Sequence, residues 1–98
     1  MELLQEDPDD PFVNYCLAQE YTVGDEHQAQ RYYETLLREH PGYLPTYYHA
    51  AHFFMKLGEE ARVKALFEEG IRQAQAQNDW HALAELRSAK LNWEMEQE

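Results

Sequence analysis

Apolar residues recur three and four positions apart along most of the chain, and no stretch alternates for long between apolar and polar residues. The first spacing is typical of α-helices with one buried face, whereas alternation would indicate strands. Alanine, leucine, glutamate, glutamine and arginine, all good helix formers, dominate between the turn signals. The pattern therefore predicts an all-α protein of five helices, at about residues 11–23, 25–40, 45–58 and 59–77, with a fifth that follows Asn78-Asp79 and runs close to the C-terminus.

Residues typical of helix ends mark the boundaries of these segments. Asp10 before Pro11 is typical of a helix start. Gly24 suits the left-handed position after the first helix, and Asp25 with Gln28 forms the capping-box pattern that starts the second. The later boundaries lie at Pro41-Gly42, Gly58 and Asn78-Asp79. Because the intervening turns are short, we expect successive helices to be antiparallel.

The helices repeat in pairs along the sequence. Residues of the second segment recur 34 positions later in the fourth, as Gly24 and Gly58, Ala29 and Val63, and Tyr33 and Phe67. Residues of the first segment recur 33 positions later in the third, as Leu17 and Ala50, Ala18 and Ala51, and Tyr21 and Phe54. Two helices that repeat together at this spacing predict a solenoid of helical hairpins.

The repeated residues resemble the signature of a tetratricopeptide repeat. The first copy reads Leu17-Ala18-x-x-Tyr21, Gly24-Asp25, Ala29-x-x-x-Tyr33 and Pro41. The second copy reads Ala50-Ala51-x-x-Phe54, Gly58, Val63-x-x-x-Phe67 and Gly70. It departs from the pattern at the final proline, where the chain has Gln75. The resemblance covers about residues 11–75 and implies that small residues lie at helix crossings with aromatic rings between them.

Together, the pattern and the resemblance imply a right-handed α-solenoid fragment. An acidic segment at 1–9 precedes residues 10–77, which hold two repeat-like hairpins at about 10–42 and 43–77. Residues 78–98 are expected to form a C-terminal capping helix in the place of a third repeat's first helix. A cap of this kind is needed because two such repeats bury too little apolar surface alone.

The charge balance restricts the classes of partner. Eight basic and 19 acidic residues give a net charge of −11, which argues against binding nucleic acid through its phosphates. Most of this charge lies at the two ends of the chain, where solubility and the recruitment of a basic partner are both open explanations. The acidic start does not resemble a signal peptide, and no apolar run is long enough to span a membrane. With Cys16 as the single cysteine, we expect a cytoplasmic protein.

No catalytic motif is present, so we expect a protein without enzymatic activity or cofactor. Cys16 lies beside Leu17 in the first segment, where it is expected to pack as a small apolar residue. His49 and His52 are three positions apart and so share a helix face, with Glu20 as a conceivable third metal ligand. Two histidines do not complete a metal site, and we expect no bound metal.

The resemblance implies a groove lined by the first helix of each repeat, which holds peptides or helices of other proteins. The positions it implies are Phe12, Tyr15, Gln19 and Thr22 from the first repeat, and Tyr48, His49, His52, Met55 and Lys56 from the second. Tyrosine and methionine are typical of protein-recognition surfaces. Members that clamp a terminal carboxylate use Lys, Asn and Arg at these positions, and only Lys56 here is basic. We therefore expect another protein or peptide held mainly by aromatic and apolar contacts.

The last helix carries two apolar stripes, whereas a simple cap has a polar outer face. Ala82, Leu86, Ala89 and Trp93 form the stripe expected to pack against the fourth helix. Trp80, Ala84, Leu91 and Met95 form a second, nearly opposite stripe. One explanation is that Trp80 folds back over the preceding turn and the helix frays after Asn92. The alternative is a unit that associates with a second copy, as a homodimer, through this stripe.

Overall fold

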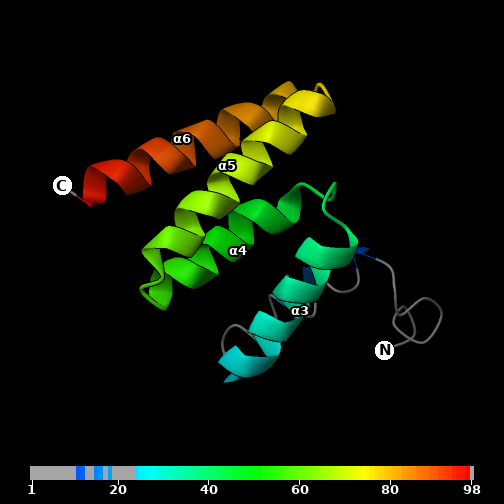
Figure 1. Cartoon of the computed structure of the whole chain (residues 1–98), viewed down its shortest axis with the longest axis vertical. Helices are drawn as coiled ribbons and strands as arrows, with labels where there is room; N and C mark the ends of the chain where they lie inside the picture. Colours follow the sequence, from blue (N-terminus) through cyan, green and yellow to red (C-terminus); the bar gives the residue numbers. More distant parts are fainter. Residues whose placement is uncertain (1–10, 13–14, 17, 19–23, 98) are drawn as a thin grey trace. The chain divides into compact units, whose positions relative to one another are not determined.

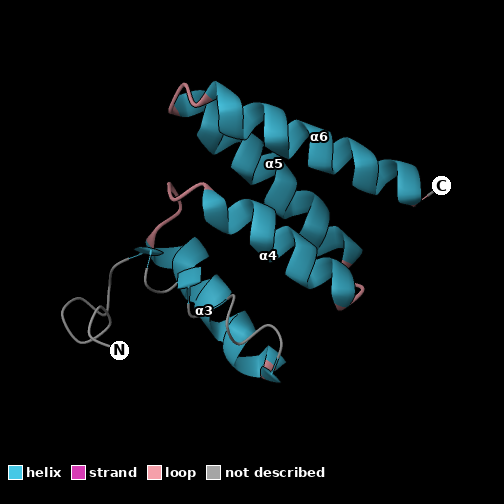
Figure 2. Ribbon diagram, turned by 180° about the vertical axis from the view of Figure 1, so that it is seen from behind, coloured by secondary structure: helices cyan, strands magenta, loops and turns pink. Residues whose placement is uncertain are grey.

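The structure is a computed structural model, and it describes residues 11–12, 15–16, 18 and 24–97. Within these residues it contains helices and turns but no strand (Figures 1 and 2). The helices are α3 (Glu26–Glu39), α4 (Pro45–Lys56), α5 (Glu60–Ala76) and α6 (Trp80–Glu96). The described residues between 11 and 18 are also helical. The predicted all-α class and the bounds of the last four segments are therefore confirmed within two residues.

Local capping explains where the helices begin. The Asp25 carboxylate accepts a hydrogen bond of 3.2 Å from the Gln28 backbone N–H at the start of α3. The Asp79 carboxylate accepts one of 3.0 Å from the Ala82 N–H at the start of α6. Both side chains satisfy backbone donors that have no partner inside the helix. Glu59, at the start of α5, makes no such bond.

The turns agree with the predicted breaks at two positions and differ at a third. Gly58 has a φ of 75°, and Asn78 has a φ of 56°, so both occupy the left-handed region that ends a helix. The expectation for Gly24 is wrong, because its backbone is helical and its φ is not positive. Asp25, with extended backbone at φ −149°, makes the change of direction there. An extended N-cap redirects the chain without a left-handed residue.

The chain divides into two compact units, Met1–Thr46 and Tyr47–Glu98. In the first unit, Ala29, Tyr33 and Leu36 form the buried stripe of α3. Their spacing of four and three residues is the one expected for a single helix face. The finer division into hairpins at 10–42 and 43–77 stays a prediction.

The core of the second unit comes from α4, α5 and α6. The predicted packing residues are all buried, namely Ala50, Ala51, Phe54, Val63, Phe67 and Gly70. Gly70 marks a close approach between helices, since a Cβ there would lie 2.7 Å from Tyr47 Cβ and 3.2 Å from Leu86 Cδ1. Small residues at crossings with aromatic residues around them are therefore confirmed in this unit.

Helix α6 packs on α5 through the first of its predicted stripes. The two helices lie side by side and antiparallel (Figures 1 and 2). Leu86 and Trp93 are buried, and the Trp93 ring lies 6.2 Å from that of Phe67. Leu83 is buried too, although the predicted stripe omitted it. The buried face of α6 is therefore wider than the predicted stripe.

The second stripe of α6 is open to solvent. Trp80 is 62% exposed, Leu91 57% and Met95 61%, and Ala84 is also exposed. The explanation in which Trp80 folds back and the helix frays after Asn92 is wrong, because α6 continues to Glu96 and Trp80 remains exposed.

Candidate protein-binding face

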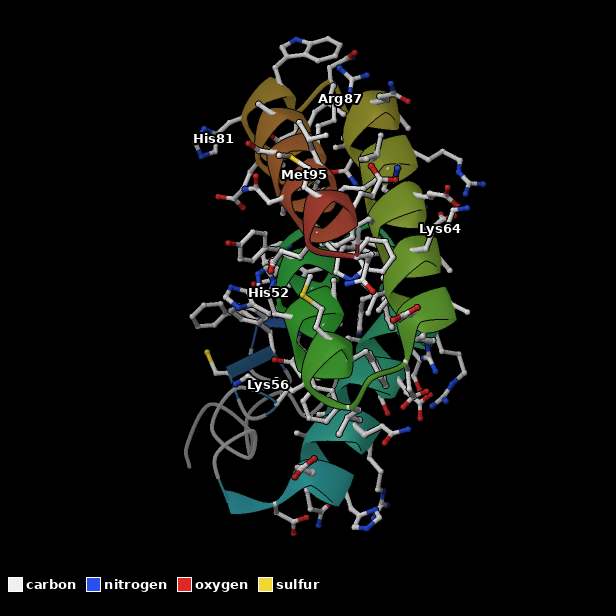
Figure 3. All side chains as sticks on the ribbon, turned by 90° about the vertical axis from the view of Figure 1, so that its left-hand side faces the viewer. His52, Lys56, Lys64, His81, Arg87 and Met95 are labelled. Carbon is white, nitrogen blue, oxygen red and sulfur yellow. The ribbon has the colours of Figure 1, made fainter. Side chains whose placement is uncertain are left out.

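One side of α4 carries the candidate binding residues of the second repeat. The opposite side, with residues such as Tyr47 and Phe54, is buried in the core. Of the candidates, three are half-buried and two are exposed, and together we call them the α4 face: Tyr48, His49, Met55, His52 and Lys56. Figure 3 shows His52 and Lys56 on the same side of α4. The helix thus presents this set together at its surface, because positions three and four apart share one side of a helix. That these residues line a groove stays a prediction.

Ring contacts hold the first turn of the α4 face in place. The Tyr48 ring lies 4.5 Å from the His52 ring and 5.2 Å from the His49 ring, measured between centroids. His52 Nδ1 lies 2.9 Å from the Tyr48 carbonyl oxygen. Because a carbonyl oxygen only accepts, this hydrogen bond assigns the Nδ1 proton to His52 and leaves Nε2 as the outward nitrogen. The face offers a prearranged aromatic surface with a polar edge.

The electrostatics of the α4 face favour a neutral His49. Burial lowers the pKa of His49 below its usual 6.5, and the neighbouring His52 lowers that pKa further. The Glu85 carboxylate of α6 acts in the opposite direction, raising the His49 pKa. Burial dominates, so His49 is uncharged at neutral pH. Lys56 lies at the C-terminal end of the face.

An open hollow of about 240 Å³ adjoins Met55. Val63 of α5 and Trp93 of α6 supply further apolar lining. Its acidic lining comes from the N-cap and first residue of α5, Glu59 and Glu60, and from Glu96 at the end of α6. Sequence reasoning missed this hollow. Its residues come from three helices, and no local sequence pattern predicts that these residues lie close together.

The candidates from the first repeat belong to the first unit. Phe12 is 52% exposed, and the Tyr15 ring packs edge-on against Tyr43 at 5.9 Å between centroids. Gln19 and Thr22 lie outside the described residues. The groove predicted from both repeats stays a prediction, and the α4 face is the part of it that is described in detail.

The described part of the chain holds neither a metal-binding cluster nor a helix that could span a membrane. No group of three or more His, Cys, Asp or Glu residues there could hold a metal ion. His49 and His52 provide two imidazoles only, and Glu20, the third ligand considered, lies outside the described residues. Among the helices described, none has both the length and the apolar character needed to cross a membrane.

The helical hairpins and their spacing are matched in known proteins. The tetratricopeptide repeat family profile matches residues 20–86. The chain belongs to the tetratricopeptide repeat family. The resemblance predicted from the repeated residues is therefore confirmed.

Two solved tetratricopeptide repeat structures are similar over most of the chain. The solution NMR structure of a tetratricopeptide repeat domain protein from Salinibacter ruber has 34% sequence identity and a TM-score of 0.82, over 88% of this chain and 88% of that chain. The crystal structure of a tetratricopeptide repeat domain protein from the same organism has 34% identity and a TM-score of 0.79, over 87% of this chain and 96% of that chain. No curated protein matches the chain significantly.

A second candidate surface of this tetratricopeptide repeat chain lies on α6. The exposed stripe of Trp80, Ala84, Leu91 and Met95 is hereafter the α6 outer face. Beside it, Leu91 and Ile71 of α5 line an open hollow of about 360 Å³. The polar residues of this hollow carry both signs of charge, with Glu68, Arg87, Lys90 and Glu94. Exposed apolar residues gathered on one helix are typical of an interaction surface.

Proposed function

We propose that this tetratricopeptide repeat chain is a non-enzymatic interaction or scaffold module, acting in the cytoplasm, that binds a segment of another protein. The α4 face is the contact surface in the second repeat, together with Phe12, Tyr15, Gln19 and Thr22 of the first. The observation that carries the proposal is the contact between the Tyr48 and His52 rings, whose centroids lie 4.5 Å apart with the planes tilted by 34°, on a helix anchored by a buried opposite side. Aromatic side chains fixed in this way lose little conformational entropy on binding.

The charges around the α4 face favour a partner segment that is apolar and aromatic rather than acidic. Lys56 is the one basic residue of the face. Next to Met55, the hollow carries Glu59, Glu60 and Glu96, which repel a carboxylate. The uncharged His49 ring and the Nε2 atom of His52 offer hydrogen-bonding groups for the backbone of a bound segment.

A pull-down with matched variants tests this function. Wild type, Tyr48→Ala and Lys64→Ala are immobilised, and the retained proteins are quantified by mass spectrometry. Lys64 is an exposed residue of α5 on the opposite side of Figure 3 from His52 and Lys56, and serves as the control. A partner should be retained by wild type and Lys64→Ala and lost from Tyr48→Ala.

Binding measurements with the purified partner then give the change in binding free energy for each variant. We expect Tyr48→Ala to weaken binding by about 2 kcal/mol, the typical cost of a truncated interface hot spot. Its melting temperature should stay close to that of wild type, because Tyr48 is only half-buried. A partner that binds all three variants equally would place the interface elsewhere.

A second candidate function is self-association as a homodimer, and the exposed α6 outer face favours it. Trp80, Leu91 and Met95 are all more than half exposed on one helix. The test is the molar mass from light scattering at rising protein concentration. Trp80→Ala combined with Leu91→Glu should convert a dimer to a monomer while helicity by circular dichroism persists. Wild type that remains monomeric at high micromolar concentration would rule out this function.

A further inference from the structure

The residues of the α6 outer face are arranged symmetrically along the helix. The midpoint between Arg87 and Ser88 lies equally far from Trp80 and Met95. Ala84 and Leu91 are likewise placed at equal distances on either side of it. A twofold axis through this midpoint, perpendicular to α6, would therefore superpose apolar positions on apolar positions.

We propose that a second copy of this chain docks on the α6 outer face, with the two α6 helices antiparallel about a twofold axis at Arg87 and Ser88. The inference rests on the proposed self-association and specifies its geometry. A twofold interface is made by the same patch on both copies, so each residue must suit the residue that the symmetry brings to it. Here Trp80 meets Met95 of the second copy, and Ala84 meets Leu91.

Side-chain size favours this antiparallel pairing over a parallel one. Small Ala84 leaves room for the larger Leu91 of the second copy, so the centre of the seam fills without a void. At each end, Met95 lies against the Trp80 indole, a favourable contact between sulfur and aromatic ring. A parallel pair would instead place Ala84 against Ala84 and leave a gap beside the axis. It would also stack Trp80 on Trp80 at one end alone.

The residues that flank the axis are exposed and belong to no packed core. Ser88 lies on one flank of the seam and Arg87 on the other, by the rotation of about 100° per helical residue. In an antiparallel twofold pair, Ser88 faces Ser88 of the second copy, and Arg87 faces Arg87 of the second copy. Ser88 is small enough to allow close approach of the backbones. The two Arg87 guanidinium groups repel one another, and this repulsion at the twofold axis destabilises the dimer.

The other charges of this surface are largely balanced within each copy. The Lys90 ammonium pairs with the Glu94 carboxylate at 2.8 Å. Glu68 of α5 lies along the same hollow as Arg87. Replacing Arg87 by glutamine should therefore remove the repulsion at the axis and leave the Lys90–Glu94 ion pair intact. We expect the dimer dissociation constant of Arg87→Gln to fall by roughly two- to five-fold, the scale of one exposed charge pair.

Disulfide trapping tests the geometry directly. Single cysteines are placed at Ser88 or at Ala84 in a Cys16→Ala background, so that each chain holds one thiol. Both positions are exposed, so neither change disturbs the core. For helices packed about 8–10 Å apart, the two copies of position 88 come within disulfide reach in the antiparallel pair. The two copies of position 84 are then separated by about 10 Å along the helix and do not link.

Each outcome of this experiment decides between the two proposals. A dimeric mass with efficient linking of Ser88→Cys, and little linking of Ala84→Cys, supports the antiparallel geometry. A dimeric mass with the reverse preference, or with no linking at either position, overturns this geometry and leaves self-association standing. A monomeric mass for wild type and for Arg87→Gln at high micromolar concentration overturns both, and would leave the α6 outer face to a different protein.

Discussion

Gly70 of α5 and Tyr47 of α4 lie so close that a Cβ atom on Gly70 would be 2.7 Å from Tyr47 Cβ. The same Cβ would lie 2.9 Å from Tyr47 Cγ. Real Cβ atoms do not approach other atoms so closely, and the nearest atom here is anchored to the backbone of α4. The absence of a side chain at position 70 therefore sets how closely these helices pack.

We expect Gly70→Ala to destabilise the protein despite the higher helix propensity of alanine. Overpacking costs about 1–3 kcal/mol and the propensity gain is about 1 kcal/mol, so the net loss of stability reaches about 2 kcal/mol. The measurement is urea denaturation followed by circular dichroism. Gly24→Ala is the matched control, because nothing lies within 4 Å of that Cβ and the φ of Gly24 is not positive. Equal stability of both variants would contradict the close packing at Gly70.

Phe54 is expected to be among the most sensitive core positions. Its side chain is fully buried, and the Arg62 guanidinium lies 4.5 Å above its ring. Phe54→Ala should cost about 3–5 kcal/mol, through lost burial and the cavity that remains. Thermal denaturation alongside Tyr48→Ala checks the assignment of the two sides of α4. A fall in melting temperature for Tyr48→Ala as large as that for Phe54→Ala would mark Tyr48 as a core residue.

The caps of α5 and α6 should respond in opposite ways to substitution. Asp79→Ala removes the acceptor of the Ala82 N–H and should cost about 1 kcal/mol. Glu59 makes no side-chain bond at the start of α5. Glu59→Asp should therefore stabilise the protein by up to about 1 kcal/mol, because the shorter side chain is a favoured N-cap. Both changes are measured by chemical denaturation, and a loss of stability in Glu59→Asp would show that the backbone there cannot accept a cap.

His49 should make the protein less stable in mild acid. Its pKa in the folded protein is lowered, mainly by burial and next by His52, so the unfolded chain binds the proton more readily. The stability linked to His49 is therefore fully present above pH 6.5 and is lost as the pH falls through the lowered pKa. The free energy of unfolding, measured between about pH 7.5 and 5.5, should fall less steeply for His49→Gln. The same substitution at His27, exposed in the first turn of α3, serves as the control for the loss of an imidazole as such.

Helix positions were predictable because the signals that set them are local. Asp25 and Asp79 cap their own helices through residues three positions away, and Gly58 needs only its own backbone freedom. The family was predictable for a related reason. Its signature is the repeated placement of small and aromatic packing residues, and these stand in the sequence at a fixed period.

The candidate site was only partly accessible from the sequence. The resemblance to the tetratricopeptide repeat implied that Tyr48 and His52 share one side of their helix, and the structure shows their rings in contact. The hollow beside Met55 and the effect of Glu85 on His49 were not predictable. Both depend on which residues of α6 lie near α4, and the residues of these two helices are far apart in the sequence.

The sequence by itself determined the helical class, the helix ends and the tetratricopeptide repeat family, since each depends on local chemistry or on a regular period. Tertiary structure decided the burial of Leu83 and the exposure of Trp80. For α6 the reason is physical, since apolar residues on both sides of a helix leave its own pattern ambiguous. Packing against α5 buries one side through Leu86 and Trp93, and leaves Leu91 and Met95 in solvent.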